Sequence, residues 1–237
     1  MLGAGALVGV CCPALAGADP GRGPSRVVVS PGNRVGTPPG FGRIAPPHPV
    51  KVEFSSPTGC TSTLTGSVNG GLVVPSNERY CLLGAHIHGG TSVQPGGEVI
   101  LEGATIDGGL RTNQATDVRV CASRVNGPTS IQNGGGTVLI GAALDDGAAA
   151  CPGNTLHRPL TISSNLAGIK VESDWITGPV TLTNNEGAAF LGSEAGAEVE
   201  ANHISGPLTC HGNTPAPVND GLPNTVTGPE TGQCAGF

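Results

Sequence analysis

The sequence predicts an all-β protein that folds as a right-handed, single-stranded parallel β-helix, a solenoid of about seven coils of 19–20 residues. The first observation is a repeat in which an apolar residue is followed five positions later by Ile or Val and then, after one further residue, by Gly. The five clear copies place the Ile or Val at Ile87, Ile106, Val125, Ile176 and Ile204. The second observation is that Gly and Pro recur every few residues, which leaves no window with enough helix formers for a helical repeat.

The third observation is an alternation of apolar and polar residues after each Gly, as in Val180 and Leu182 against Thr181 and Thr183. Alternation of this kind places one set of side chains inside a strand layer and the other set outside. Coils stacked roughly 4.8 Å apart would bury the inner set against itself, so each coil depends on its neighbours for stability.

The spacing between copies indicates the hand of the helix. Ile87, Ile106 and Val125 follow one another at intervals of 19 residues, whereas Ile176 and Ile204 are separated by 28. The remaining features of the repeat are a copy at Leu156, insertions around 145–153 and 187–197, and weaker copies at Leu64-Thr65-Gly66 and Val226-Thr227-Gly228. Left-handed β-helices favour strict hexapeptides, so this variation in coil length favours the right-handed form.

Three asparagines, Asn165, Asn185 and Asn213, fall in the same slot of the repeat, just after a strand. Asn tolerates left-handed backbone angles and forms hydrogen bonds to neighbouring turns. We therefore expect a ladder of stacked asparagines in one corner of the helix, in preference to a sugar-binding role for these residues.

The chain divides into four segments. Residues 1–18 are interpreted as a signal peptide, because a short apolar run there ends in small residues; the run is too short for a transmembrane segment. Residues 19–49 are rich in Pro and Gly and are interpreted as a disordered linker. Residues 50–209 would form the β-helix, and residues 210–237 a C-terminal cap over its last strand edges. This organisation predicts a secreted protein that is extracellular or associated with the cell wall.

Six cysteines remain after the signal peptide: Cys60, Cys81, Cys121, Cys151, Cys210 and Cys234. An even number in an exported chain indicates disulfide bonds, and six cysteines allow fifteen connectivities. We favour Cys60–Cys81, Cys121–Cys151 and Cys210–Cys234, because each pair ties a cap or an insertion to an adjacent coil. A cysteine metal site is disfavoured, because this part of the chain has no C-x-x-C motif.

Composition and motifs exclude several functions. Residues 50–237 carry 16 acidic and 7 basic side chains, which argues against a nucleic-acid partner. The chain has no G-x-S-x-G motif, phosphate loop or dinucleotide fingerprint. The adjacent carboxylates Asp145 and Asp146 are the candidates for a catalytic pair, although a solvated turn explains them better.

Two groups of residues are candidates for metal ligands. Glu172 and Glu200 occupy one outward slot of neighbouring coils, and Ca²⁺ would relieve their repulsion, as would water and salt. His86 and His88 flank Ile87 and so point outward together, with Asp107 as the one further ligand that the next coil offers. Surface histidines explain this pair without a metal. No cofactor is expected, with Ca²⁺ as the one alternative.

Four residues are candidates for contact with a carbohydrate. Trp175 offers an aromatic surface for stacking, and Thr161, Thr181 and Thr209 occupy equivalent outward slots in successive coils. The preference of Thr for exposed strands explains that row without a function.

The region 60–237 resembles the broad class of small right-handed β-helix proteins that includes pectate-lyase-like and bactofilin-like solenoids. Its C-terminal part, 204–236, contains the sequence T-V-T-G-P at 225–229 and is similar to a group of secreted actinobacterial proteins with T-V-T-G-P repeats. That group has no assigned activity, so the resemblance implies a fold and a location but no chemistry.

The sequence favours a non-enzymatic structural or interaction protein that engages a cell-wall or extracellular polysaccharide through one shallow face. The alternative is a carbohydrate-active enzyme, a polysaccharide lyase or glycoside hydrolase built on a β-helix. A third possibility is a protein that polymerises end to end. The expected caps, disulfides and export argue against it.

Overall fold

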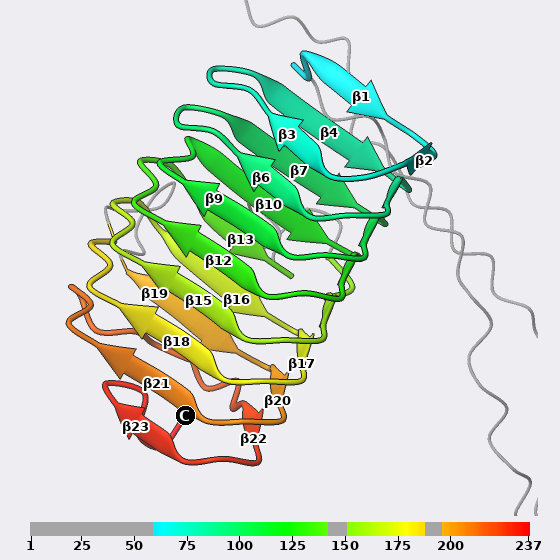
Figure 1. Ribbon diagram of the computed structural model, residues 1–237. Coiled ribbons are helices and arrows are strands. Elements are labelled where there is room, and N and C mark those ends of the chain that lie inside the picture. The colour runs from blue at the N-terminus through cyan, green and yellow to red at the C-terminus, as the bar shows by residue number, and fades with distance from the viewer. Residues whose placement is uncertain (1–58, 142–150, 188–195) are drawn as a thin grey trace, which may run out of the picture. The chain divides into compact units, whose positions relative to one another are not determined.

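The computed structural model describes residues 59–141, 151–187 and 196–237, which fold as a right-handed parallel β-helix (Figure 1). In Figure 1 the front strands run from right to left while the coils descend toward the C-terminus, which is the winding of a right-handed helix. The coils contribute one strand each to three parallel sheets, here called A, B and C, with seven, eight and eight strands, because the last described coil adds strands to B and C only. The fold class predicted from the sequence is confirmed.

The strands follow one another from coil to coil in each sheet. Sheet A consists of β1 (Ser62–Leu64), β4 (Arg79–Leu83), β7 (Glu98–Glu102), β10 (Asp117–Cys121), β13 (Val138–Ile140), β16 (Ile169–Glu172) and β19 (Ala197–Glu200). Sheet B consists of β2 (Ser67–Val68), β5 (His86–Ile87), β8 (Thr105–Ile106), β11 (Arg124–Val125), β14 (Thr155–Leu156), β17 (Trp175–Ile176), β20 (His203–Ile204) and β22 (Thr225–Val226). Sheet C consists of β3 (Leu72–Val74), β6 (Thr91–Val93), β9 (Leu110–Asn113), β12 (Thr129–Gln132), β15 (Leu160–Ser163), β18 (Val180–Thr183), β21 (Leu208–His211) and β23 (Glu230–Gly232).

The register of sheet B follows the sequence repeat. The pairs stack in the order Val68, Ile87, Ile106, Val125, Leu156, Ile176, Ile204 and Val226. The copy expected at Leu64-Thr65-Gly66 is wrong, because Leu64 pairs with Leu82 in sheet A. The first coil has one residue fewer between its two apolar positions, so a fixed spacing of five misses the true copy at Val68.

The core is a column of aliphatic side chains from all three sheets, including Leu101, Ile106 and Leu110, which are fully buried. The coils stack closely at the corner between sheets B and C, where the Gly of the repeat lies. A Cβ added to Gly108 would lie 2.6 Å from the backbone nitrogen of Gly90. The repeat requires Gly here because the backbones of adjacent coils leave no room for a side chain.

Two ladders of polar side chains run along the corners. In the predicted one, Asn165 Nδ2 donates to Asn185 Oδ1 at 3.0 Å, and Asn185 Nδ2 donates to Asn213 Oδ1 at 2.8 Å. These asparagines are buried, which confirms the structural interpretation. A second ladder, between sheets A and B, was not predicted and consists of Asn154, Asp174, Asn202 and Asn224.

Three disulfide bonds join Cys60 to Cys81, Cys121 to Cys151 and Cys210 to Cys234, the pairing expected from the sequence. Each links neighbouring coils or a coil and an insertion. No helix in the described ranges has the length and apolar character needed to cross a membrane.

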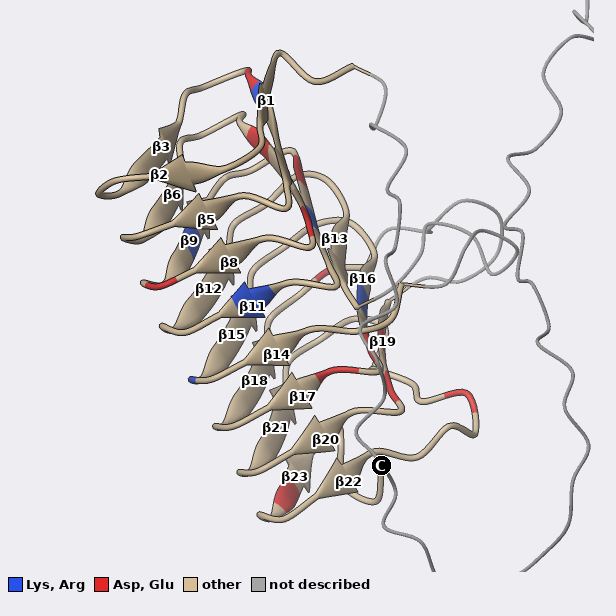
Figure 2. Ribbon diagram, turned by 90° about the vertical axis from the view of Figure 1, so that its right-hand side faces the viewer, with Lys and Arg blue, Asp and Glu red and all other residues tan. Residues whose placement is uncertain are grey.

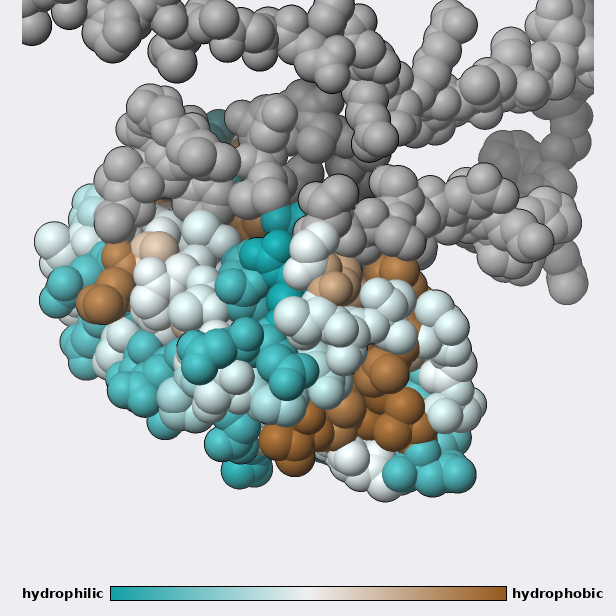
Figure 3. Space-filling model, turned by 90° about the horizontal axis from the view of Figure 1, so that it is seen from above, coloured by the Kyte–Doolittle hydropathy of each residue, from teal (hydrophilic) through white to brown (hydrophobic). Residues whose placement is uncertain are grey.

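The two ends of the β-helix are formed by different elements. Residues 210–237, assigned from the sequence to a cap, include β22 and β23, which extend sheets B and C by one strand each. At the N-terminal end, seen from above in Figure 3, brown hydrophobic surface lies beside hydrophilic surface. Leu64, Val68 and Leu72 of the first coil pack against the core but are only partly buried.

Candidate functional site

Sheet B, which faces the viewer in Figure 2, carries most of the described histidines on or beside its strands. Four of the five described histidines, His86, His88, His157 and His203, lie on this face or directly beside its strands, together with Trp175. The strands are only two residues long, and their second residue is a buried Ile, Leu or Val along β5 to β20. The residues on either side of that apolar residue therefore point outward and form two parallel columns.

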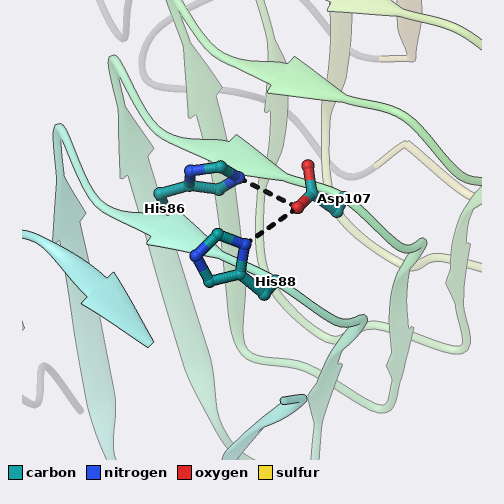
Figure 4. A group of neighbouring side chains, drawn as sticks. All are labelled: His86, His88 and Asp107. Atoms are coloured by element: carbon teal, nitrogen blue, oxygen red, sulfur yellow. Dashed lines mark hydrogen bonds and ion pairs between the residues drawn. The ribbon is translucent and has the colours of Figure 1, made fainter. Parts of the chain in front are cut away.

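His86, His88 and Asp107 form the closest cluster of metal-ligand groups on this face (Figure 4). One carboxylate oxygen, Asp107 Oδ2, lies 3.0 Å from His86 Nε2 and 3.2 Å from His88 Nδ1. Ile87 is fully buried between the two histidines, so both rings project from the same side of β5. All three side chains are about 40% exposed, and each of them is predicted from the sequence as a candidate metal ligand.

The carboxylate of Asp107 is held from a second direction. Asn126 Nδ2 donates to Asp107 Oδ1 at 3.2 Å, and Arg124 Nε donates to the amide oxygen of Asn126 at 3.0 Å. The hydrogen bond from His86 is the main cause that lowers the pKa of Asp107, with smaller contributions from His88 and Asn126. Both carboxylate oxygens therefore have defined partners, and the group is ionised at neutral pH.

Trp175 lies further along the same face and stacks on His203 of the next coil. The ring centroids are 3.9 Å apart and the planes are inclined by 20°. Trp175 pairs in register with Thr155 of the preceding coil and remains 51% exposed. Trp175 is predicted from the sequence as a candidate, whereas His203 is not, although both occupy the slot before the repeated Ile.

His157 lies beside Thr155 and has a distinct environment. Its Nε2 atom is buried without a hydrogen-bond partner. Burial, followed by the positive charges of Arg124 and Arg158, lowers the pKa of this histidine. The ring is consequently neutral at pH 7.

The threonines expected to share a carbohydrate-binding face with Trp175 lie on a different sheet. Thr161, Thr181 and Thr209 stack in one outward column of sheet C, as their register in the sequence predicts. Trp175 belongs to sheet B, so the four candidates do not form one surface. The sequence reveals the period of a coil but not the face on which each slot lies.

The acidic column lies on sheet A, beside a lysine, Lys170, that was not predicted to take part. Glu172 and Glu200 are register partners, as expected. Lys170 Nζ lies 2.7 Å from Glu198 Oε2 and 3.6 Å from Glu172 Oε1. Glu172, Glu198 and Glu200 form a second group of possible metal ligands, but the ammonium group supplies positive charge where Ca²⁺ was considered.

Burial governs the protonation of this column. Desolvation raises the pKa of Glu172, and the charge of Lys170 opposes the shift. The pKa of Glu102, further up the column, is also raised by desolvation, against the charge of Arg119. Lys170 and Glu198 are themselves buried, so their charged groups have little contact with solvent.

The catalytic candidates Asp145 and Asp146 lie outside the described residues. The chain matches no protein-family model, and comparisons with curated proteins and with solved structures find no match either. Fold and site together define a disulfide-bonded parallel β-helix protein in which four of the five described histidines and the indole lie on or beside one outer face.

Proposed function

We propose that this is a secreted or cell-surface, non-enzymatic interaction protein that binds an extracellular or cell-wall polysaccharide on sheet B. The observation that carries the proposal is the half-exposed indole of Trp175, stacked on His203 in a regular, rigid sheet. An indole held flat by a neighbouring ring offers its other surface to the C–H face of a sugar without loss of rotamer freedom. The three disulfide bonds support an oxidising, extracellular location.

The surroundings of Trp175 suit a neutral or weakly acidic glycan. Thr155 and Arg124 precede Trp175 in the same outward column. Their side chains differ in length, and both carry hydrogen-bond donors. The register places Arg124 two strands from Trp175, roughly 10 Å at the usual strand spacing. Because consecutive residues of this column stand on stacked strands, a linear polymer lying along the axis of the β-helix would meet them in sequence.

Fluorescence offers a direct test, because Trp175 is the single tryptophan of the chain. The oxidised protein is titrated with peptidoglycan fragments, teichoic acid, pectin, alginate and chitin oligosaccharides while the indole emission is recorded. Binding on sheet B is expected to shift or quench the emission. Calorimetry with the same ligand should show at least about a tenfold loss of affinity in Trp175→Ala.

The matched control is Thr181→Ala, which removes an outward side chain from sheet C and should leave the affinity unchanged. Loss of binding in Thr181→Ala with retention in Trp175→Ala would move the site to sheet C and refute the proposal. Absence of binding to every polymer would also count against it and would direct attention to self-association.

The acidic column of sheet A supports an enzyme as the second candidate. Glu172, Glu198 and Glu200 offer carboxylate oxygens within 4.8 Å of one another, next to Lys170, and paired carboxylates carry out general acid and base catalysis in polysaccharide cleavage. The burial of Lys170 and Glu198 restricts access for a polymer, which is why binding is favoured. New reducing or unsaturated ends that disappear in Glu198→Gln would establish the enzyme instead.

A further inference from the structure

We infer that His86, His88 and Asp107 form a binding site for a single divalent transition-metal ion such as Zn²⁺ or Cu²⁺. The inference is independent of the proposed polysaccharide function. It rests on the convergence of two imidazole nitrogens on one carboxylate oxygen, at 3.0 and 3.2 Å. The three donor atoms lie within 4.8 Å of one another (Figure 4).

These separations are close to those of a coordinated ion. Zinc binds nitrogen and oxygen at about 2.0–2.1 Å, so two ligand atoms of a tetrahedral site are about 3.3 Å apart. The distances from Asp107 Oδ2 to the two nitrogens are within a few tenths of an ångström of that value. A small rotation of the carboxylate or of either ring therefore makes room for an ion between the three groups.

The backbone holds the ligands in position. His86 and His88 flank Ile87, which pairs in register with Ile106 directly before Asp107. The backbone N–H of Asp107 donates to the carbonyl oxygen of Ile87 at 2.9 Å, which fixes the two strands at this point. Asn126 then binds the remaining oxygen of Asp107 and directs Oδ2 toward the histidines. A second layer of hydrogen bonds of this kind is what orients ligands in known metal sites.

The donor set selects the ion. Two imidazoles and one carboxylate suit Zn²⁺, Cu²⁺ and Ni²⁺, whereas Ca²⁺ and Mg²⁺ require oxygen ligands. The ligand side chains are about 40% exposed, so water or an external donor completes the coordination. Binding also requires the tautomers that carry their protons on His86 Nδ1 and His88 Nε2, because the nitrogens facing Asp107 must present lone pairs.

The test is calorimetric titration of the full, oxidised and tag-free chain with ZnCl₂, together with native mass spectrometry for stoichiometry. We expect one ion per chain and no competition from excess CaCl₂. His86→Gln, His88→Gln and Asp107→Asn should each weaken binding at least about tenfold, and Asn126→Ala should weaken it by about tenfold through the orientation of Asp107.

His157→Gln is the matched control, because His157 lies in the same outward column as His88 but in a separate coil. The affinity of the His157→Gln variant for Zn²⁺ should equal that of the unaltered protein. Circular dichroism verifies that every variant is folded. Absence of binding, or an affinity that is the same in His86→Gln, His88→Gln and His157→Gln, would overturn the inference. The titration contains no glycan, so failure of the polysaccharide proposal leaves its result unaffected.

Discussion

Asn154 donates two hydrogen bonds to the same oxygen of Asp174, from its backbone nitrogen at 2.6 Å and from its side-chain nitrogen at 2.9 Å. The other oxygen, Asp174 Oδ2, is buried without a partner. Asp174 thus occupies a position in the ladder that Asn occupies in the neighbouring coils. Asn202 and Asn224 use their side-chain nitrogen there to donate to the carbonyl oxygens of Val171 and Val199.

The environment of Asp174 predicts that the carboxyl group is largely protonated at neutral pH. Burial raises its pKa to about 8, from an ordinary value of 3.8. The unfolded chain ionises at the lower value, so the free energy of unfolding is highest below pH 4 and falls as the pH rises to about 8. Above that pH both states are ionised and the loss is complete.

Asp174→Asn should remove this loss, because an amide completes the ladder and does not ionise. We expect the variant to be more stable at pH 8, by on the order of a few kcal/mol, and the advantage to shrink toward pH 4. Urea denaturation at pH 4, 6 and 8 measures the difference between the two proteins. Asp107→Asn serves as control, since the pKa of Asp107 is lowered from 3.8 and the titration of this carboxyl changes the stability mainly below the range tested. A constant difference between pH 4 and 8 would show that Asp174 does not titrate in this range.

The core contains a threonine whose replacement should stabilise the protein. Thr112 is 3% exposed, lies between Val93 and Ile131 in register, and has a buried hydroxyl group without a partner. Thr112→Val keeps the shape and removes the unsatisfied hydroxyl, so the free energy of unfolding should rise by about 1 kcal/mol. Thr181→Val, on the outer side of sheet C, should change it little. Destabilisation by Thr112→Val, measured by urea denaturation, would mean that the hydroxyl group is satisfied in solution.

The asparagine ladder should be sensitive to truncation in its middle. Asn185 donates to Asn213 Oδ1 and to the carbonyl oxygen of Ile162, and it accepts from both nitrogens of Asn165. Asn185→Ala removes these hydrogen bonds between buried polar groups and should lower the free energy of unfolding by about 2–4 kcal/mol. Asn69→Ala, at an exposed position, should have almost no effect. Equal effects of the two substitutions on the denaturation midpoint would contradict a structural role for the ladder.

The disulfide bond between Cys210 and Cys234 should hold the last coil in place. Both cysteines are fully buried, and the bond closes a loop with a sequence separation of 24. The double variant Cys210→Ala/Cys234→Ala should lose about 2–4 kcal/mol of stability. Hydrogen exchange should increase first in β22 and β23, while the central strands of the three sheets keep their protection. A uniform increase along the whole β-helix would show that the bond stabilises the entire chain rather than its end.

Much of the fold follows from the sequence because a parallel β-helix pairs residues one repeat apart. The spacing of Ile87, Ile106 and Val125 therefore gave both the fold and the register of the central coils. The asparagine ladder and the cysteine pairs follow from the same period, since residues in equivalent slots or adjacent coils are neighbours in space. The period failed at Leu64, where a coil one residue shorter shifts the alignment.

What the tertiary structure alone decided is how slots are distributed around the coil and how far side chains reach. The repeat gives position along the axis but not the number of faces or the location of the corners, which depend on core packing. Trp175 and Thr181 therefore lie on different sheets, and Asp174 is buried in a corner rather than exposed on a strand. The meeting of His86 and His88 at one oxygen of Asp107 depends on ring and carboxylate rotations. The sequence can place these residues side by side but cannot set those angles, because they follow from contacts with the surrounding coils.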